Sequence, residues 1–183
     1  MGGYKNLLIY RCAVTISDLT VIFCQKWIDK RSRTHDQMVQ AARSGKQNIA
    51  EASKEVSTSS DMLLSSVSRS SYTELAEDYE DFLRQNGHQF WTKDDPRIIR
   101  IRQFREDVSV ITSLTNLTNW TNLDFTKSEN FANLMICLCM KQGFLMDQFL
   151  RAKEKKFVET GGFKENLFKK RAEFRAGKFG KLD

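Results

Sequence analysis

Hydrophobic residues recur at steps of three and four along most of this chain, which is the spacing of one face of an α-helix. The first such segment has an apolar stripe that includes Ile9, Ile16 and Phe23, and polar residues fill the positions between them. The same spacing returns three more times, with short polar links after the first two segments. The four predicted helices are residues 4–29, 34–54, 60–84 and 128–158.

Polar residues mark where these helices are expected to begin and end. Thr34, followed by Gln37 three residues later, has the spacing of a capping box, so the second helix is expected to begin there. Asn86 and Gly87 are expected to end the third helix, because both residues tolerate the backbone conformation of a helix terminus. Ser128 is expected to cap the fourth helix.

Residues 88–127 are the part of the chain that least resembles a helix bundle. Pro96 follows two aspartates and is suited to the first position of a short helix. A Thr-Asn-x triplet then repeats three times over residues 115–123, and a three-residue period fits neither a helix nor a strand. We therefore expect an extended, ordered loop here. Its expected packing residues are Leu117, Trp120 and Leu123.

A short amphipathic segment follows the fourth helix. Gly161 and Gly162 are expected to stop that helix, and residues 164–175 are expected to form another one. The chain is therefore predicted to be all-α: an up-and-down four-helix bundle over residues 1–158, with the insert 88–127 before the last helix. Residues 159–183 would then form a C-terminal suffix.

The second helix carries small residues on the face that is expected to point inward. Glycine in a helix interior costs about 1 kcal/mol relative to alanine, so Gly45 indicates a neighbouring helix that needs the space. Asn48 and Glu51 would lie near this contact, either as a buried hydrogen-bonded pair that fixes helix register or as ligand contacts at a subunit interface. The predicted structural and oligomer residues are Ala41, Ala42, Gly45, Asn48 and Glu51.

The positive charge of the chain is concentrated at its C-terminal end. Residues 1–150 contain 18 Lys and Arg and 18 Asp and Glu, which cancel. Residues 151–183 contain 11 cationic and 5 anionic residues, so the whole net charge of +6 lies there. A basic segment attached to a neutral body indicates an anionic partner.

Cationic and aromatic residues are interleaved in the suffix, a pattern typical of segments that bind single-stranded nucleic acid. Lys and Arg neutralise phosphates, while exposed rings such as Phe168, Phe174 and Phe179 stack on unpaired bases. Alternatively, these rings pack on a neighbouring bundle and the charges stay in water. The predicted nucleic-acid contacts of the suffix are Lys164, Lys169, Lys170, Arg171, Arg175 and Lys178.

A second group of cations lies on or next to the second helix. A group of cations on one helix makes nucleic acid a candidate ligand here as well. Alternatively, these charges pair with Asp29, Asp36 and Glu51 on a solvated face. The four candidate residues are Arg31, Arg33, Arg43 and Lys46.

The sequence contains no pattern typical of catalysis or metal binding. His35 and Asp36 are adjacent on one helix, which is expected to keep them from facing each other as a base and its orienting acid. Cys137 and Cys139 are two residues apart and would point in different directions, so all four cysteines are expected to be reduced core residues. We therefore predict a protein that is not an enzyme, with no catalytic residue, no cofactor and no bound metal.

The chain is also expected to lie in the cytoplasm without contact to a membrane. We find no run of about 18 apolar residues, which is the length that a membrane span requires. The apolar run near the first residue is too short for a secretory signal.

The second helix resembles the signature of the bacterial four-helix-bundle family named after the 23S rRNA intervening-sequence protein. That signature has paired alanines, a serine and then Asn-Ile-Ala-Glu-Gly, and this chain has Ala52 where the final glycine is usual. The third helix is similar to the Ser-x-x-Glu-Leu stretch of the family, and residues 161–175 resemble the suffix of one subgroup. The matching residues are Met38, Ala41, Ala42, Ser44, Asn48, Ile49, Ala50, Glu51, Ser70, Ser71, Glu74 and Leu75.

This resemblance implies a homopentamer of four-helix bundles. The accessory protein of diversity-generating retroelements has the same fold group, and it binds a reverse transcriptase and RNA. The resemblance therefore implies a nucleic-acid-associated accessory or scaffold protein, most simply an RNA-binding one. The alternative is a protein-interaction module that recruits a partner enzyme, such as a reverse transcriptase, without contacting nucleic acid itself.

Overall fold

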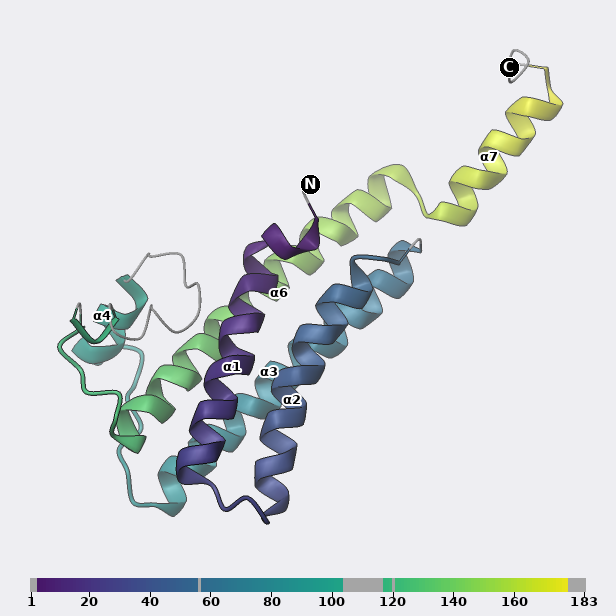
Figure 1. Ribbon diagram of the computed structural model, residues 1–183. Helices are drawn as coiled ribbons and strands as arrows, with labels where there is room; N and C mark the ends of the chain where they lie inside the picture. Colours follow the sequence, from purple (N-terminus) through teal and green to yellow (C-terminus); the bar gives the residue numbers. More distant parts are fainter. Residues whose placement is uncertain (1–2, 56, 104–116, 120, 178–183) are drawn as a thin grey trace.

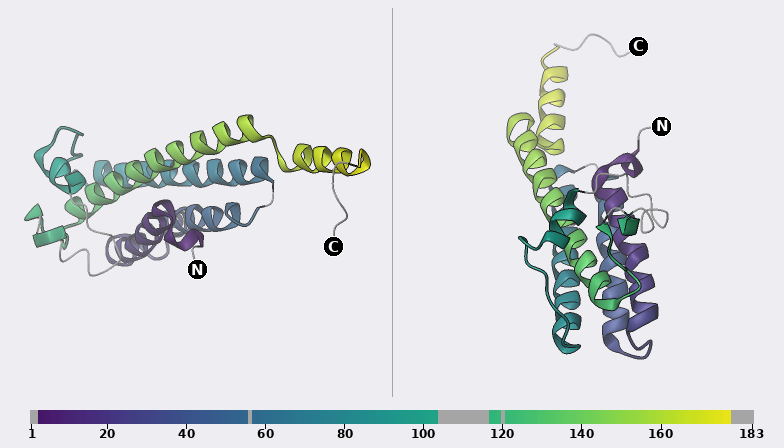
Figure 2. Two further views of the ribbon diagram at one scale, coloured as in Figure 1. Left: turned by 90° about the horizontal axis from the view of Figure 1, so that it is seen from above. Right: turned by 90° about the vertical axis from the view of Figure 1, so that its left-hand side faces the viewer.

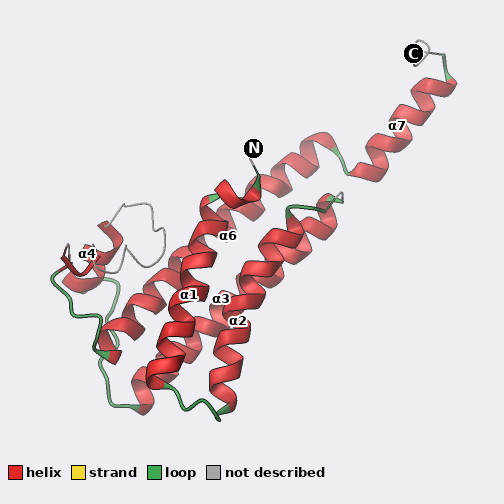
Figure 3. Cartoon of the chain, in the orientation of Figure 1, coloured by secondary structure: helices red, strands yellow, loops and turns green. Residues whose placement is uncertain are grey.

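The computed structural model describes residues 3–55, 57–103, 117–119 and 121–177, and these residues are helical with connecting turns (Figure 1). No strand occurs among them, which Figure 3 shows directly, so the predicted all-α class is confirmed. The helices are η1 (Tyr4–Asn6), α1 (Leu8–Trp27), α2 (Arg33–Ala52), α3 (Thr58–Gln85), α4 (Pro96–Gln103), α6 (Ser128–Thr160) and α7 (Phe163–Arg175).

Four long helices pack side by side. Helix α1 packs on α2 and α6, and α3 packs on the same two helices. Each of the four therefore makes its most extensive contacts with two of the others, and successive helices run in opposite directions (Figures 1 and 2). Helix α4 packs on α6, while α7 projects from the end of α6 away from the other helices (Figure 1).

An aromatic cluster around Phe23 lies at one end of the core. The Phe23 side chain is fully buried, and the ring centroids of Tyr79, Phe82 and Trp27 lie 4.8, 4.9 and 5.0 Å from its own. Phe131 on α6 completes the cluster at 5.8 Å. Edge-to-face and tilted pairs of this kind contribute about 0.5–1.5 kcal/mol each beyond their buried area, so the cluster joins α1, α3 and α6.

The first half of α6 is buried on all sides. Residues 131–137 are buried without interruption, because α1 and α3 pack along this helix and α4 lies against it. The Asn133 side chain, 1% exposed, accepts a hydrogen bond from the Trp91 backbone N–H at 2.8 Å and donates one to the Gln89 carbonyl at 2.9 Å. This amide therefore fastens the segment after α3 onto α6 and satisfies the Trp91 N–H and the Gln89 carbonyl.

The observed helix ends agree with the sequence prediction at the C-terminal end of α3 and differ at the starts of α2, α3 and α6, with α3 beginning at Thr58 instead of residue 60. Gly87 has a positive φ of 66°, which glycine adopts without strain, and the chain turns there as predicted. The predicted cap of α2 at Thr34 is wrong. The Ser32 hydroxyl accepts a hydrogen bond from the His35 backbone N–H at 3.1 Å, so Ser32 is the cap and α2 begins at Arg33. Ser128 is likewise the first residue of α6 and not its cap.

The insert is more helical than predicted. Helix α4 begins at Pro96, as expected. The predicted extended loop is wrong for residues 117–119 and 121, which are helical, and the Thr121 hydroxyl donates to the Leu117 carbonyl at 2.6 Å. A threonine side chain satisfies a carbonyl one turn back in this way, so a Thr-Asn-x repeat is compatible with a helix. The predicted packing residue Trp120 lies outside the described residues.

One helix in the described part of the chain is long and apolar enough to cross a membrane. It is α1, and its most apolar 18-residue window has a mean hydropathy of 1.3. Half of that window is buried among the other helices, and the central helix of a folded domain satisfies the same criterion. The expectation that no segment reaches this length and apolarity is therefore corrected for α1, whose apolar stripe forms part of the core.

Candidate functional site

Helix α7 is set apart from the rest of the chain by two glycines. Gly161 has a positive φ of 73° and ends α6, as the sequence predicted. The Gly162 backbone N–H donates to the Glu165 carboxylate at 3.0 Å, which satisfies one free N–H at the start of α7. The helix then runs to Arg175, and all of its residues are exposed except the half-buried Asn166.

Two stripes run along α7, because residues three and four apart lie on the same face of a helix. One stripe is basic and aromatic, and its members repeat at every turn. They are Lys164, Phe168, Arg171 and Arg175. The second stripe is mostly apolar and lies about a quarter turn away. It consists of Phe163, Leu167, Lys170 and Phe174. The rings of both stripes are at least half exposed, and that of Phe168 is 74% exposed.

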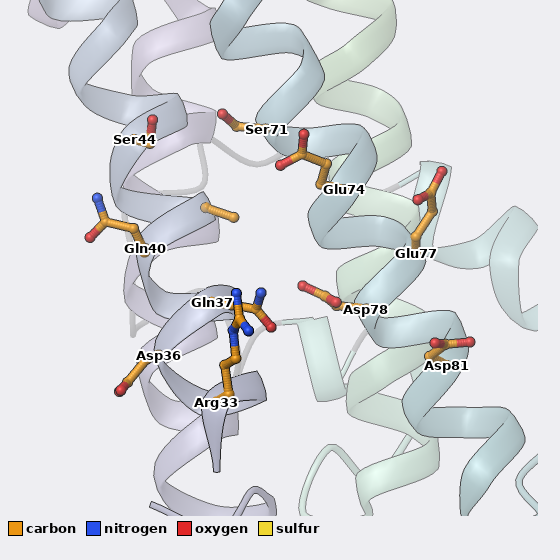
Figure 4. Close-up of a pocket in the computed structure, with 11 residues that line it drawn as sticks. Arg33, Asp36, Gln37, Gln40, Ser44, Ser71, Glu74, Glu77, Asp78 and Asp81 are labelled. Carbon is orange, nitrogen blue, oxygen red and sulfur yellow. The ribbon is translucent and has the colours of Figure 1, made fainter. Parts of the chain in front are cut away.

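A groove of about 750 Å³ lies between α2 and α3, near the start of α2 and the end of α3. Three of its lining residues are small and at least partly buried, and they form its floor: Ala41, Ser44 and Ser71. Carboxylates line the α3 side, and Glu74 and Asp78 point toward α2 in Figure 4. The groove is lined by Arg33, Asp36, Gln37, Gln40, Ala41, Ser44, Ser71, Glu74, Glu77, Asp78 and Asp81.

The α3 wall of the groove has excess negative charge. Partial burial raises the pKa of Asp78, and the neighbouring carboxylates of Asp81, Glu74 and Glu77 raise it further. Asp81 pairs with Arg84 at 2.7 Å, whereas Glu74, Glu77 and Asp78 form no ion pair within the described part of the chain. The repulsion among these groups would be relieved by a cationic ligand or partner.

The predicted small-residue face of α2 packs against α3 within the same chain. A Cβ atom added to Gly45 would lie 2.6 Å from Cζ of Tyr72, so the two helices approach closely at this glycine. The Ser68 hydroxyl donates to the Gly45 carbonyl at 2.7 Å, which ties the backbone of α2 to α3. Ala42 is buried beside Gly45, and Ala41 is half buried at the edge of the groove.

The structure does not bring Asn48 and Glu51 together as a buried pair within one chain. The Asn48 amide donates to the Ser44 hydroxyl at 3.4 Å, one turn earlier on α2. Glu51 is exposed, so any burial of its carboxylate requires a second molecule.

The four predicted cations of the second helix are not gathered into one patch. Arg33 lines the acidic groove, while Arg43 and Lys46 lie one turn apart on α2 and do not line it. Arg31 precedes α2, and its backbone N–H donates to the Asp29 carboxylate at 2.9 Å. In the suffix, α7 carries Lys164, Lys169, Lys170, Arg171 and Arg175, whereas Lys178 lies outside the described residues.

Two histidines have polar neighbours that the sequence did not reveal. His35 Nδ1 lies 3.4 Å from Asp36 Oδ1, so adjacent helical residues do face each other here, contrary to expectation. His88 Nε2 lies 3.0 Å from the Ser128 hydroxyl, and its Nδ1 lies 3.7 Å from the Glu129 carboxylate. The longer distance exceeds that of a hydrogen bond. The shorter contact, with Ser128, joins the segment after α3 to the start of α6, as the hydrogen bonds of Asn133 do.

Three of the four cysteine thiols are buried in the core, and burial raises the pKa of each, whereas Cys12 is half buried. Cys24, Cys137 and Cys139 are buried, and all four cysteines are free, as predicted. Burial raises the pKa of Cys24 to about 12 and raises that of Cys139 well above its usual range. Protonated thiols are poor nucleophiles and poor metal ligands. Within the described residues, no group of three or more His, Cys, Asp and Glu side chains is placed to hold a metal ion.

Sequence reasoning missed the groove between α2 and α3. The carboxylates of one wall lie at the end of the third helix, but the polar residues Gln37 and Gln40 opposite them come from a segment about forty residues earlier. Comparisons with protein-family models, with curated proteins and with solved structures found no match for this chain. What the protein does must therefore be inferred from its own helices and surfaces.

Proposed function

We propose that this protein is a non-enzymatic accessory or scaffold protein that binds RNA and works as a homo-oligomer. The observation that carries the proposal is the basic and aromatic stripe of α7, which is exposed along the whole helix. Its 13 residues span about 20 Å, enough to follow several nucleotides. Cations at successive turns neutralise phosphates, and the exposed ring of Phe168 is available to stack on an unpaired base.

The arrangement of the long helices supports a four-helix bundle made of α1, α2, α3 and α6. It also supports membership of the 23S rRNA intervening-sequence protein family, because the small residues of the resembling segment lie where α2 approaches α3. On that resemblance we propose a cytoplasmic homopentamer that is not associated with a membrane. A ring of copies would repeat each α7 arm around one assembly, so weak contacts of each arm with one RNA would add up.

The cations of α2 are weaker candidates for RNA contact than those of α7. Arg33 lies in the acidic groove, where carboxylates compete with phosphate for it. Arg43 and Lys46 form only a pair, and Lys46 is half buried. Repulsion from the carboxylates of α3 also disfavours an approach of the RNA backbone to this side of the molecule.

The proposal is tested by measuring the affinity of the full chain for a single-stranded RNA by fluorescence anisotropy at several salt concentrations. Changing Lys164 and Arg175 together to Ala removes two cations from one stripe of α7. The slope of log K against log salt is expected to fall by about 1.4, since each lost phosphate contact contributes about 0.7 for a single strand. The matched control changes Arg43 and Lys46 to Ala, which also removes two cations.

Two results of this measurement contradict the proposal. An unchanged slope in the α7 variant, with a reduced slope in the α2 variant, would place RNA on the helical body. Absence of salt-dependent RNA binding by the unmodified chain would remove the nucleic-acid function itself.

A second candidate function is recruitment of a partner enzyme, such as a reverse transcriptase, through apolar contacts. The specific observation is that Met140 and Phe144 lie one turn apart on α6 and are 48% and 60% exposed. Affinity purification with the full chain as bait, at low and high salt, separates the two functions. Salt-insensitive capture of one protein that Phe144→Ser abolishes would favour recruitment, whereas salt-sensitive RNA capture favours the first proposal.

A further inference from the structure

Within the described part of the chain, one face of α7 has no packing partner. The apolar stripe of Phe163, Leu167 and Phe174 is 46–58% exposed, and no other helix packs extensively against α7. This stripe is separate from the basic and aromatic one, so a helix that holds RNA on one face still has this face free. Exposed apolar stripes of amphipathic helices are typical of surfaces that pack into a groove on a partner.

The charge around this stripe matches the groove between α2 and α3. Lys170 lies within the stripe and Arg171 lies on its flank, and α7 as a whole has five cations and two carboxylates. The groove has carboxylates from five lining residues and a single cation, Arg33. Three carboxylates of its α3 wall have no ion-pair partner in the described chain, so a cationic helix would neutralise charge that is otherwise uncompensated.

The floor of the groove is also suited to a helix. Ala41, Ser44 and Ser71 contribute only small side chains there, which leaves room for the larger side chains of an incoming helix. The incoming stripe supplies the bulk that the floor lacks, with leucine and phenylalanine facing small residues. Cations beside the stripe would then lie next to the carboxylates of the α3 wall.

A chain cannot place α7 in its own groove. Lys153 of α6 pairs with Asp61 of α3, which fixes where the two helices lie relative to each other. α6 continues about 10 Å past that pair, and α7 is about 20 Å long, so an α7 folded back at the glycines would end about 10 Å beyond Asp61. The acidic residues from Glu74 to Asp81 lie about 20–30 Å beyond Asp61 along α3. In Figure 1, α7 points away from that end of the molecule.

We propose that the groove between α2 and α3 receives helix α7 of a second copy of this chain. Phe163, Leu167 and Phe174 pack on the small-residue floor, and Lys170 and Arg171 approach the carboxylates of α3. Two copies can exchange their helices reciprocally, or each can pass α7 to the next copy around a closed ring. This inference rests on the homo-oligomeric part of the proposed function and leaves Lys164, Phe168 and Arg175 available for RNA.

The experiment is a charge exchange between the two surfaces, with mass measured by light scattering after nuclease treatment of the full chain. The groove variant combines Glu74→Lys with Glu77→Lys, two exposed residues whose replacement leaves the core intact. The helix variant combines Lys170→Glu with Arg171→Glu. Each variant alone is expected to raise the apparent dissociation constant of the oligomer at least about tenfold, because like charges then face each other. Combining all four substitutions is expected to restore assembly.

A matched control reverses an exposed carboxylate outside the groove, and Glu55→Lys at the end of α2 serves this purpose. It is expected to leave the mass distribution unchanged. The proposal is overturned by a monomeric unmodified chain, by an oligomer that neither surface variant weakens, or by two weakened variants whose combination is not restored. An oligomer disrupted equally by Glu55→Lys also overturns it, since the effect would then come from net charge.

RNA anisotropy on the groove variant distinguishes this inference from the proposed function. The groove variant retains every cation of α7, so it is expected to bind RNA as a smaller species. If the unmodified chain assembles but does not bind RNA, only the proposed nucleic-acid function is contradicted. If the unmodified chain binds RNA but any of the overturning results above is found, only the proposed docking of α7 is contradicted.

Discussion

The first half of α6 and helix α7 are close in the chain and have opposite surroundings. Residues 131–137 of α6 are buried on every side, and even the polar Asn133 is enclosed and fully hydrogen-bonded. α7, about thirty residues later, exposes nearly every side chain, including three phenylalanines. Burial makes the first region a source of stability, whereas the second contributes little to folding and is free to bind. Stability and binding are therefore assigned to different helices, and substitutions can separate them.

The largest effect is expected from Gly45→Leu, which tests whether the stability of the buried helices depends on close packing between them. A side chain at this position would overlap the Tyr72 ring, so we expect a loss of about 3 kcal/mol in the free energy of unfolding. Chemical denaturation followed by circular dichroism measures it. The control is Gly143→Ala on α6, where a Cβ meets no atom within 4 Å and a gain of about 0.5–1 kcal/mol is expected. Equal stability of the Gly45 variant and the unmodified chain would contradict the close approach.

Asn133→Ala is expected to cost about 2 kcal/mol, because it leaves the buried Trp91 N–H without an acceptor. The loss should be local, with faster hydrogen exchange at Trp91 and in α4 than in α2 and α3. Hydrogen exchange read by mass spectrometry checks this. Uniformly faster exchange across the chain would show instead that Asn133 supports the whole core and not one segment.

Asp78→Asn sharpens the comparison at the groove, which is intermediate between the buried and exposed regions. A carboxyl whose pKa is raised on folding destabilises the folded state at pH values above its folded pKa and has no such effect below its unfolded pKa. The variant should therefore be more stable than the unmodified chain at pH 7, by less than about 1 kcal/mol, and this gain should vanish in acid. Thermal melts from pH 7 down to pH 3 test it. A gain that stays constant with pH would exclude charge repulsion as the cause.

The smallest effect is expected from ending the chain before α7. Deletion of residues 161–183 should change the unfolding free energy of the remaining helices by less than about 0.5 kcal/mol, since α7 is exposed. The same deletion should abolish most RNA binding. The measurement is made at high dilution, where copies of the chain are separate. A large loss of stability under these conditions would show that α7 stabilises the other helices of its own chain, contrary to the comparison above.

The helices were predictable because each long one keeps an apolar face over many turns. Phe23, Met38, Leu75 and Met135 are all buried as that periodicity requires. Helix boundaries depend on a single side chain in a turn and are harder to predict. Ser32 takes the capping role at α2 that was expected of Thr34, and Lys127 precedes α6 where Ser128 was expected to cap it. The Thr-Asn-x repeat was misinterpreted because Thr121 satisfies the Leu117 carbonyl within a helix.

The candidate surfaces were predictable to different degrees. The cations and rings of α7 are local in sequence, so their exposure and spacing followed from one segment. The groove depends on Gln37 and Asp78 coming together from two helices, and the pattern of either helix alone does not contain that information. Gly45 is an intermediate case, because a glycine within a helix indicates a close neighbour without identifying Tyr72 as that neighbour.

The Gly161–Gly162 joint has an electrostatic consequence. By ending α6 and starting a separate helix, it carries the cations near Arg175 about 20 Å beyond the last turn of α6. At physiological ionic strength, charges about 8 Å apart are already substantially screened from each other in water. The carboxylates of the body therefore cannot cancel the field of the arm. An anion approaching from solution would experience a cationic rod with five cations and two carboxylates, although residues 1–150 behind it are neutral overall.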